Sequence, residues 1–234
     1  MRRLLAALAP ACAALAVSVS PAGATSECRG LMVCVPVAGP WVVVPTGAGP
    51  VRPTVEYQLS CPRGFIVGGL DAELSDRAID LEFQGTLGSP VNPGVSTSRA
   101  AVFVGTYVGA AARAATFRPH IGCRPSSGGG IRVPTATGVF PVGKPTVRRV
   151  KEVRLVPGAQ RVSQACAAGE LLVGASHAIG FYTPSAPPSA ALVREVSSAR
   201  TVRDGAVVAA VHSGGAVRSL RAVVQVGALC SGGK

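Results

Sequence analysis

Two stretches of this chain, residues 61–123 and 166–230, share one pattern, and each begins and ends with a cysteine. The first begins Cys61-Pro-Arg-Gly-Phe-Ile-Val-Gly-Gly69, and the second begins Cys166-Ala-Ala-Gly-Glu-Leu-Leu-Val-Gly174. Both end in an apolar run that leads into the closing cysteine. A self-similar period of this length is typical of tandem copies of one structural unit. The pattern therefore constrains the architecture, whereas it carries no signature of a chemical activity.

The N-terminus has the three parts of a secretory signal peptide. A charged start, a mostly apolar middle and a small-residue end occupy residues 2–3, 4–19 and 22–24. The alternatives are a transmembrane anchor, for which the apolar run is short, and a lipoprotein anchor at Cys12, whose preceding residues match poorly. We therefore expect cleavage of residues 1–24, a mature chain that begins near Thr25, and no transmembrane segment in it. The predicted location is extracellular, with cell-wall association as a further expectation.

An even number of cysteines in an exported chain predicts disulfides rather than a metal site. The six that remain after removal of the signal are Cys28, Cys34, Cys61, Cys123, Cys166 and Cys230. If the two copies fold alike, each copy has its own bond between its first and last cysteine, and Cys28 and Cys34 close a small loop. A zinc site is disfavoured because no C-x-x-C occurs and the three histidines lack ligand spacing.

Short β-rich segments bounded by glycine or proline dominate the mature chain. They lie at residues 41–45, 66–67, 78–83, 101–108, 207–211 and 222–226. We expect each copy to end in a hairpin, with residues 102–108 paired to 116–123 in the first copy and 206–211 paired to 219–230 in the second.

The predicted fold class is all-β, with two tandem disulfide-closed β-sandwich-like repeats. The expected boundaries are a signal peptide over 1–24, a first repeat over 25–125, a Gly/Ser linker over 126–131 and a second repeat over 132–234.

The Cys-x-x-Gly…Gly opening and the closing cysteine resemble small β repeats in secreted proteins of high-GC Gram-positive bacteria. The resemblance covers most of the mature chain and rests on few fixed residues, because Gly68-Gly69 becomes Val173-Gly174 in the second copy. Most such proteins have no assigned activity. The resemblance therefore implies the architecture and no mechanism.

An acidic cluster in the first copy is the sharpest local accumulation of charge. Its members are Asp71, Glu73, Asp76, Asp80 and Glu82. Calcium takes six to eight oxygen ligands, so Asp71, Glu73 and Asp76 are a candidate calcium site. The alternative is a solvated strand face, which Asp80 and Glu82 fit. The second copy lacks these carboxylates, so the shared fold does not require them.

Positive charge is concentrated in the second copy. Residues 25–130 carry eight arginines against seven acidic residues, whereas residues 131–234 carry thirteen lysines and arginines against four. A field of this sign attracts anionic polymers. The candidate binding residues are Arg148, Arg149, Lys151, Arg154 and Arg161. Nucleic acid is disfavoured because few aromatic side chains are present to stack on bases, and the alternative is a solubilising charged surface.

The sequence favours a non-enzymatic secreted or cell-wall-associated binding or structural protein that contacts anionic surface polymers and needs no cofactor. His177 and His212 have neighbouring serines, but no nucleophile elbow accompanies them. The alternative function is a secreted hydrolase or inhibitor, and the sequence does not define the oligomeric state.

Overall fold

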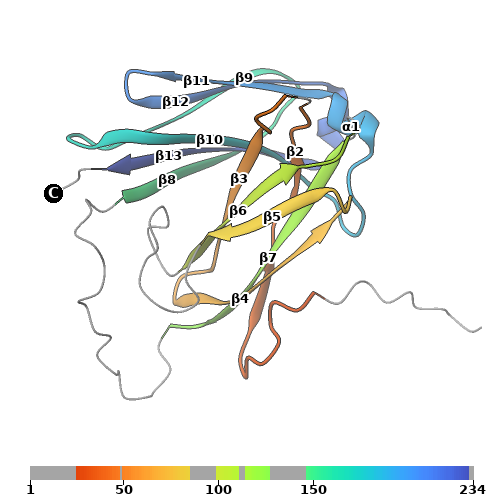
Figure 1. Ribbon diagram of the computed structural model, residues 1–234, viewed down its shortest axis with the longest axis vertical. Coiled ribbons are helices and arrows are strands. Elements are labelled where there is room, and N and C mark those ends of the chain that lie inside the picture. Colours follow the sequence, from red (N-terminus) through yellow and green to blue (C-terminus); the bar gives the residue numbers. More distant parts are fainter. Residues whose placement is uncertain (1–24, 48, 85–98, 111–113, 127–145, 232–234) are drawn as a thin grey trace, which may run out of the picture.

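The computed structural model describes residues 25–47, 49–84, 99–110, 114–126 and 146–231 (Figure 1). Strands account for nearly all of the regular structure in these residues, so the predicted all-β class is confirmed. None of the described helices has the length and apolar character needed to cross a membrane. The predicted signal peptide and most of the predicted linker lie outside the described residues.

The first half of the molecule, residues 25–126, forms two facing sheets. Its strands are β1 (Val35–Ala38), β2 (Trp41–Val44), β3 (Thr54–Ser60), β4 (Phe65–Leu74), β5 (Ile79–Gln84), β6 (Ala100–Tyr107) and β7 (Ala115–Pro125). In one sheet β7 is central, with β4 along one edge and β1 followed by β2 along the other. In the other sheet the order is β3-β6-β5.

The second half, residues 146–231, pairs its strands in the same order. Its elements are β8 (Thr146–Arg154), β9 (Gly158–Ala165), β10 (Leu171–Tyr182), α1 (Ala190–Arg194), β11 (Val196–Arg203), β12 (Ala206–Ser213), the 3-10 helix η1 (Gly215–Ser219) and β13 (Arg221–Ser231). The central β13 lies between β8 and β10, and the facing sheet has the order β11-β12-β9.

The glycine motif of each opening marks a β-bulge. The register shifts between Val67 and Gly69 on β4 and between Leu172 and Gly174 on β10. In both halves the residue just before the shift pairs with the closing cysteine, Cys123 or Cys230. A bulge bends its strand and increases the local twist, so both halves bend at the same point of the ladder.

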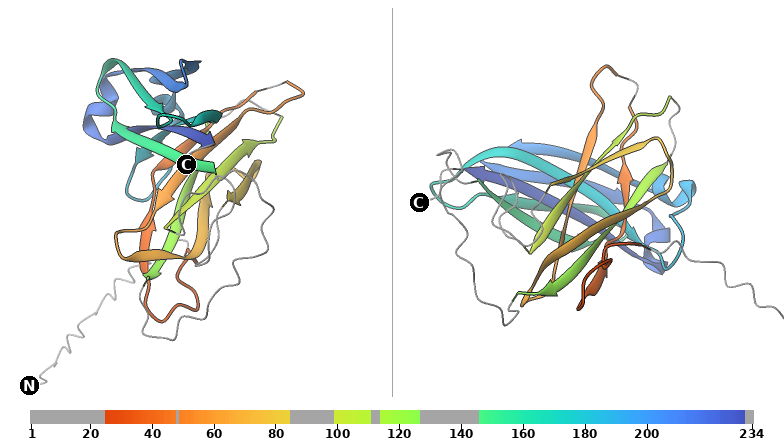
Figure 2. Two further views of the ribbon diagram at one scale, coloured as in Figure 1. Left: turned by 90° about the vertical axis from the view of Figure 1, so that its left-hand side faces the viewer. Right: turned by 60° about the horizontal axis from the view of Figure 1, so that its bottom comes forward.

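The two halves share one long sheet. Gly180 and Phe181 of β10 pair with Val42 and Trp41 of β2, which joins the central sheets into seven strands. The strands of the second half run across those of the first half (Figures 1 and 2). A division into two repeats at residues 126–131 stays a prediction.

The three predicted disulfides are present, and the two long ones join facing sheets. Cys61 directly follows β3 and bonds to Cys123 on β7, while Cys166 directly follows β9 and bonds to Cys230 on β13. Phe103 and Phe117 are fully buried between the first pair of sheets. Each half thus has an apolar core enclosed by two sheets and fastened by one covalent bond.

The predicted hairpins at the ends of the two copies are wrong. β6 pairs with β3 and β5, and β12 pairs with β11 and β9, so neither pairs with the strand that follows it. β6 and β7 are the centres of opposite sheets, and the chain crosses from one layer to the other between them. In the second half η1 makes this crossing where the sequence predicts a turn.

Candidate binding surfaces

The structure separates the five predicted anion-binding residues into buried and exposed groups. Arg148 is only 8% exposed; its guanidinium forms an ion pair with Glu56 and lies 3.4 Å from Ser176 Oγ. The prediction that Arg148 binds a polymer is therefore corrected, because the side chain is enclosed between the halves. Successive side chains of a strand point to opposite faces of the sheet. Arg148 points to the face that β3 covers.

Arg149 is already paired. Its Nε donates to Glu170 Oε2 at 2.9 Å, and a second nitrogen donates to the other carboxylate oxygen. These hydrogen bonds hold the pKa of Glu170 below its ordinary value and raise the pKa of Arg149. Because a forked guanidinium–carboxylate pair satisfies both partners, Arg149 contributes little to an external anion site.

The contact between the halves explains the burial of Arg148. The edge of β3 lies against the outer face of β8, β13 and β10. Gln58 N–H donates to Gln225 Oε1 at 2.7 Å, and Gln225 Nε2 donates back to the Gln58 carbonyl at 3.0 Å. Tyr57 donates its hydroxyl to Glu152 at 2.7 Å, and burial together with this carboxylate raises the pKa of Tyr57. Gln225 thus satisfies the backbone groups of an edge strand that would otherwise be open.

An open hollow lies on the outer face of the β9-β12-β11 sheet. Its volume is about 580 Å³, and it is lined by Ala159, Gln160, Arg161, Ser197, Ser198, Ala199, Ala210, Val211 and His212. Two cross-strand rows build it. One row is Arg161–Ala210–Ala199, and the other is Ala159–His212–Ser197. Small alanines form the floor, and the polar side chains of these rows stand beside it. We call this site the basic hollow.

Arg161 is the cation that lines the basic hollow, and other exposed cations are spread over several elements of the second half. Exposed side chains of the second half that make no ion pair are Lys151, Arg154, Arg161, Arg194, Arg200, Arg203 and Arg218. Three of the four acidic residues of this half are engaged elsewhere: Glu152 with Tyr57, Glu170 with Arg149, and Glu195 with the Ala216 amide. The fourth, Asp204, is exposed in the turn between β11 and β12, so the exposed cations that make no ion pair outnumber the remaining carboxylates in the described part of this half.

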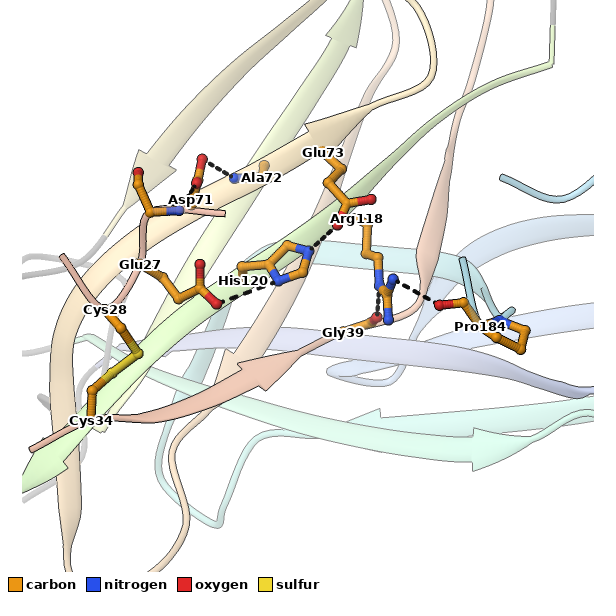
Figure 3. Close-up of polar contacts among 11 residues, drawn as sticks. Glu27, Cys28, Cys34, Gly39, Asp71, Ala72, Glu73, Arg118, His120 and Pro184 are labelled. Carbon is orange, nitrogen blue, oxygen red and sulfur yellow. Dashed lines mark hydrogen bonds and ion pairs between the residues drawn. A yellow bond between two sulfur atoms is a disulfide. The ribbon is translucent and has the colours of Figure 1, made fainter. Parts of the chain in front are cut away.

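Asp71 of the acidic cluster holds the N-terminal segment in place (Figure 3). We call residues 25–34, closed by the Cys28–Cys34 disulfide, the clip. Ser26 N–H donates to Asp71 Oδ2, and Ala72 N–H donates to Oδ1 at 2.8 Å. Burial opposes ionisation of Asp71, but these backbone hydrogen bonds outweigh it and lower the pKa of the carboxyl.

A buried side chain of the clip, Glu27, faces a buried side chain of β7, His120. His120 on β7 is 6% exposed, and its Nε2 lies 3.0 Å from Glu73 Oε1 while its Nδ1 lies 3.9 Å from Glu27 Oε1. Figure 3 shows the imidazole between the two carboxylates. Sequence reasoning missed Glu27 and the contact of His120, because no spacing in the chain connects the clip to β7.

The candidate calcium residues are not brought together. Asp71 binds the clip, Glu73 lies against His120, and Asp76 caps the turn by accepting from Ala78 N–H at 2.9 Å. Within the described residues the one gathering of three ligand atoms is Cys166, Glu170 and Cys230. Its two sulfurs are joined in a disulfide, so it is not a set of free thiolate ligands.

A serine and a histidine do meet in the second half. His177 Nε2 lies 3.0 Å from Ser198 Oγ, within the distance of a nucleophile and its base. Burial, and then Arg200, lower the pKa of His177. Its Nδ1 is buried without a hydrogen bond to any described residue, whereas a triad places an acid there. The adjoining cavity of about 120 Å³ is also smaller than ordinary ligand pockets of about 300–1,000 Å³.

Comparison of the chain with protein-family models, with curated proteins and with solved structures finds no match.

Proposed function

We propose that the protein is a non-enzymatic extracellular binding module that holds an anionic surface polymer in the basic hollow of its second half. The main observation behind this proposal is the hollow, where Arg161 stands beside an open floor of alanines and makes no ion pair with a described residue. Such a surface attracts a polyanion from a distance and then offers it a shaped contact.

The lining supports a phosphate- or carboxylate-bearing polymer such as a teichoic acid or an acidic polysaccharide. Arg161 supplies a forked donor for a charged oxygen. Ser197 and His212 add hydrogen-bonding groups on the neighbouring row, and the low alanine floor leaves room for a sugar or polyol unit. Arg203 lies farther along the same face of β11, where a second charge of an extended polymer would pass.

Retention on a heparin or teichoic-acid column tests the proposal. The variant Arg161→Ser/Arg203→Ser removes one charge in the hollow and one farther along the same face. The control Arg63→Ser/Arg77→Ser removes two exposed charges from the first half. We expect the first variant to elute at clearly lower salt than the second, since net charge is matched and location alone differs. Binding should weaken with salt because exposed charges are screened beyond about 8 Å at physiological ionic strength. Equal elution of the two variants would refute the site.

A further inference from the structure

The outer faces of the two central sheets are equivalent surfaces. We call two residues that face each other on neighbouring strands a rung. The rung Asp71–His120 on β4 and β7 and the rung Ser176–Gly227 on β10 and β13 lie at the same distance from the closing cysteine and from the bulge of their half, so they correspond. We call the outer face of β1, β7 and β4 the first face, and the outer face of β8, β13 and β10 the second face.

The second face holds a strand edge. Glu56 of β3 forms an ion pair with Arg148, whose guanidinium lies 3.4 Å from Ser176 Oγ. Two residues from Gly227 along β13, Gln225 exchanges two hydrogen bonds with the backbone of Gln58. β3 is the edge strand of the order β3-β6-β5, so this face covers an open sheet edge.

The clip covers the corresponding rungs of the first face. Ser26 binds Asp71, and the carbonyl of Glu27 rests on the paired glycines Gly69 and Gly122. A Cβ atom added at either glycine would overlap that carbonyl. The glycines thus leave space for a segment that lies flat on the sheet, beside the residue pair Asp71–His120, which is equivalent to a pair that lies under the β3 contact on the second face.

The counterpart of β3 in the second half is β9, an edge strand of the order β11-β12-β9. Among the described residues no strand pairs with its other edge. Counted from Cys61 and Cys166, Arg161 occupies on β9 the position that Glu56 occupies on β3. The first face presents Asp71 and Glu73 where an arriving Arg161 would lie. The charges are reversed relative to the Glu56–Arg148 contact, and they remain complementary.

We propose that the first face is a docking site for the β9 edge of a second copy of this chain, and that the clip is the plug that closes it. In the proposed contact, the β9 edge of one molecule lies on the first face of another, as β3 lies on the second face within one molecule. Because the two surfaces are different, the contact is head-to-tail and each docked copy leaves a further site open. The proposal does not depend on polymer binding in the basic hollow.

Sedimentation velocity on the full-length mature chain tests this. Gly122→Leu displaces the clip and installs the side chain that the second face carries at the equivalent position, Leu229. We expect the native chain to stay monomeric, and the variant to form species whose size rises with concentration. The matched control is Gly215→Ala, since a Cβ atom at Gly215 meets nothing within 4 Å; it should sediment as the native chain does.

Charge exchange identifies the contact. In the Gly122→Leu background, Arg161→Glu should weaken association by at least about tenfold, the effect of losing one close charge pair. Asp71→Arg should do the same, and Asp71→Arg combined with Arg161→Asp should restore association. Association that is indifferent to Arg161→Glu overturns the proposal, as that result would identify exposed apolar surface as the cause.

A second variant covers the case in which Gly122→Leu does not fold. Cys28→Ser/Cys34→Ser opens the loop of the clip without adding a side chain to the sheet. Hydrogen exchange at the Ser26 amide reports release of the clip from Asp71. Association must follow that release in both variants. In Cys28→Ser/Cys34→Ser, where Gly69 and Gly122 are intact, an added oxidised peptide of residues 25–34 must reverse the association. A released clip in a chain that stays monomeric at every concentration overturns the proposal.

Discussion

The first and second faces rest on the same ladder of strands, yet each binds a different segment of the chain. The second face binds a regular strand edge through the buried guanidinium of Arg148 and through the side-chain amide of Gln225, which forms hydrogen bonds with the backbone of Gln58. The first face binds an irregular clip through two glycines and a carboxylate that accepts from a backbone N–H. The comparison shows that side chains at a few rungs decide what a β-sheet face accepts, while the ladder beneath them stays the same.

The largest expected effect comes from the disulfides, because the bond of the second half closes a much longer loop than the bond of the clip. The Cys166–Cys230 bond spans 64 residues, whereas Cys28–Cys34 spans 6. By the chain-entropy estimate, Cys166→Ala/Cys230→Ala lowers the free energy of unfolding by about 4 kcal/mol and Cys28→Ala/Cys34→Ala by about 2 kcal/mol. Urea denaturation of both double variants measures the two losses. Equal losses would contradict the view that one bond holds a core and the other only shapes the clip.

The second face predicts a sharp contrast between two neighbouring arginines. Arg148→Ala leaves the Glu56 carboxylate without its partner and should cost about 2 kcal/mol of unfolding free energy, below the range for a fully buried pair because Glu56 keeps 30% of its side chain exposed. Arg149→Ala removes a guanidinium that is 36% exposed, and the Glu170 carboxylate that it leaves keeps its hydrogen bond from the Ala167 amide, so the cost should be clearly smaller.

Urea denaturation also measures this contrast, with Glu56→Gln/Arg148→Met as the control that removes both charges together. The double variant should recover part of the loss, since no carboxylate remains unpaired. If Arg148→Ala and Arg149→Ala lower the free energy of unfolding by the same amount, the contact of β3 with the second face is not buried.

Cysteine spacing and β-rich segments were sufficient to predict the fold class and the disulfides. The bonds could be predicted because a shared pattern implies a shared internal bond. The pairing of strands could not be predicted, since the consecutive apolar residues of β6 fit a central strand of either sheet. A hairpin is the default for adjacent strands, and here the chain crosses between layers instead.

The candidate sites were only partly predictable for a related reason. Arg161, which was selected from the basic residues before Cys166, is exposed and lines the basic hollow, and its role in binding stays a prediction. Arg148 looks the same in sequence, but its partner Glu56 lies on a strand far away in the chain. The clip's contact with β4 and β7 is equally non-local, so no sequence period reports it. Long-range pairs of this kind depend on the packing of the finished fold.

The smallest expected effect is a pH dependence of stability that comes from His177 in the second half. In the first half His120 lies between two carboxylates, whereas in the second half His177 is half-buried near the guanidinium of Arg200. Burial, and secondly Arg200, lower the pKa of His177 below 6.5 in the folded state. Between that lowered pKa and the ordinary value, the unfolded chain therefore binds more protons than the folded chain does.

Stability should accordingly be retained above about pH 6.5 and lost as the pH falls through the folded-state pKa of His177. Glutamine cannot titrate, so His177→Gln should flatten the dependence in this window and leave the region near neutral pH little changed. The measurement is the free energy of unfolding in urea at a series of pH values from about 7.5 to about 5 for both proteins. A variant that keeps the full slope would assign the pH dependence to other groups and would remove His177 from the contrast between the halves.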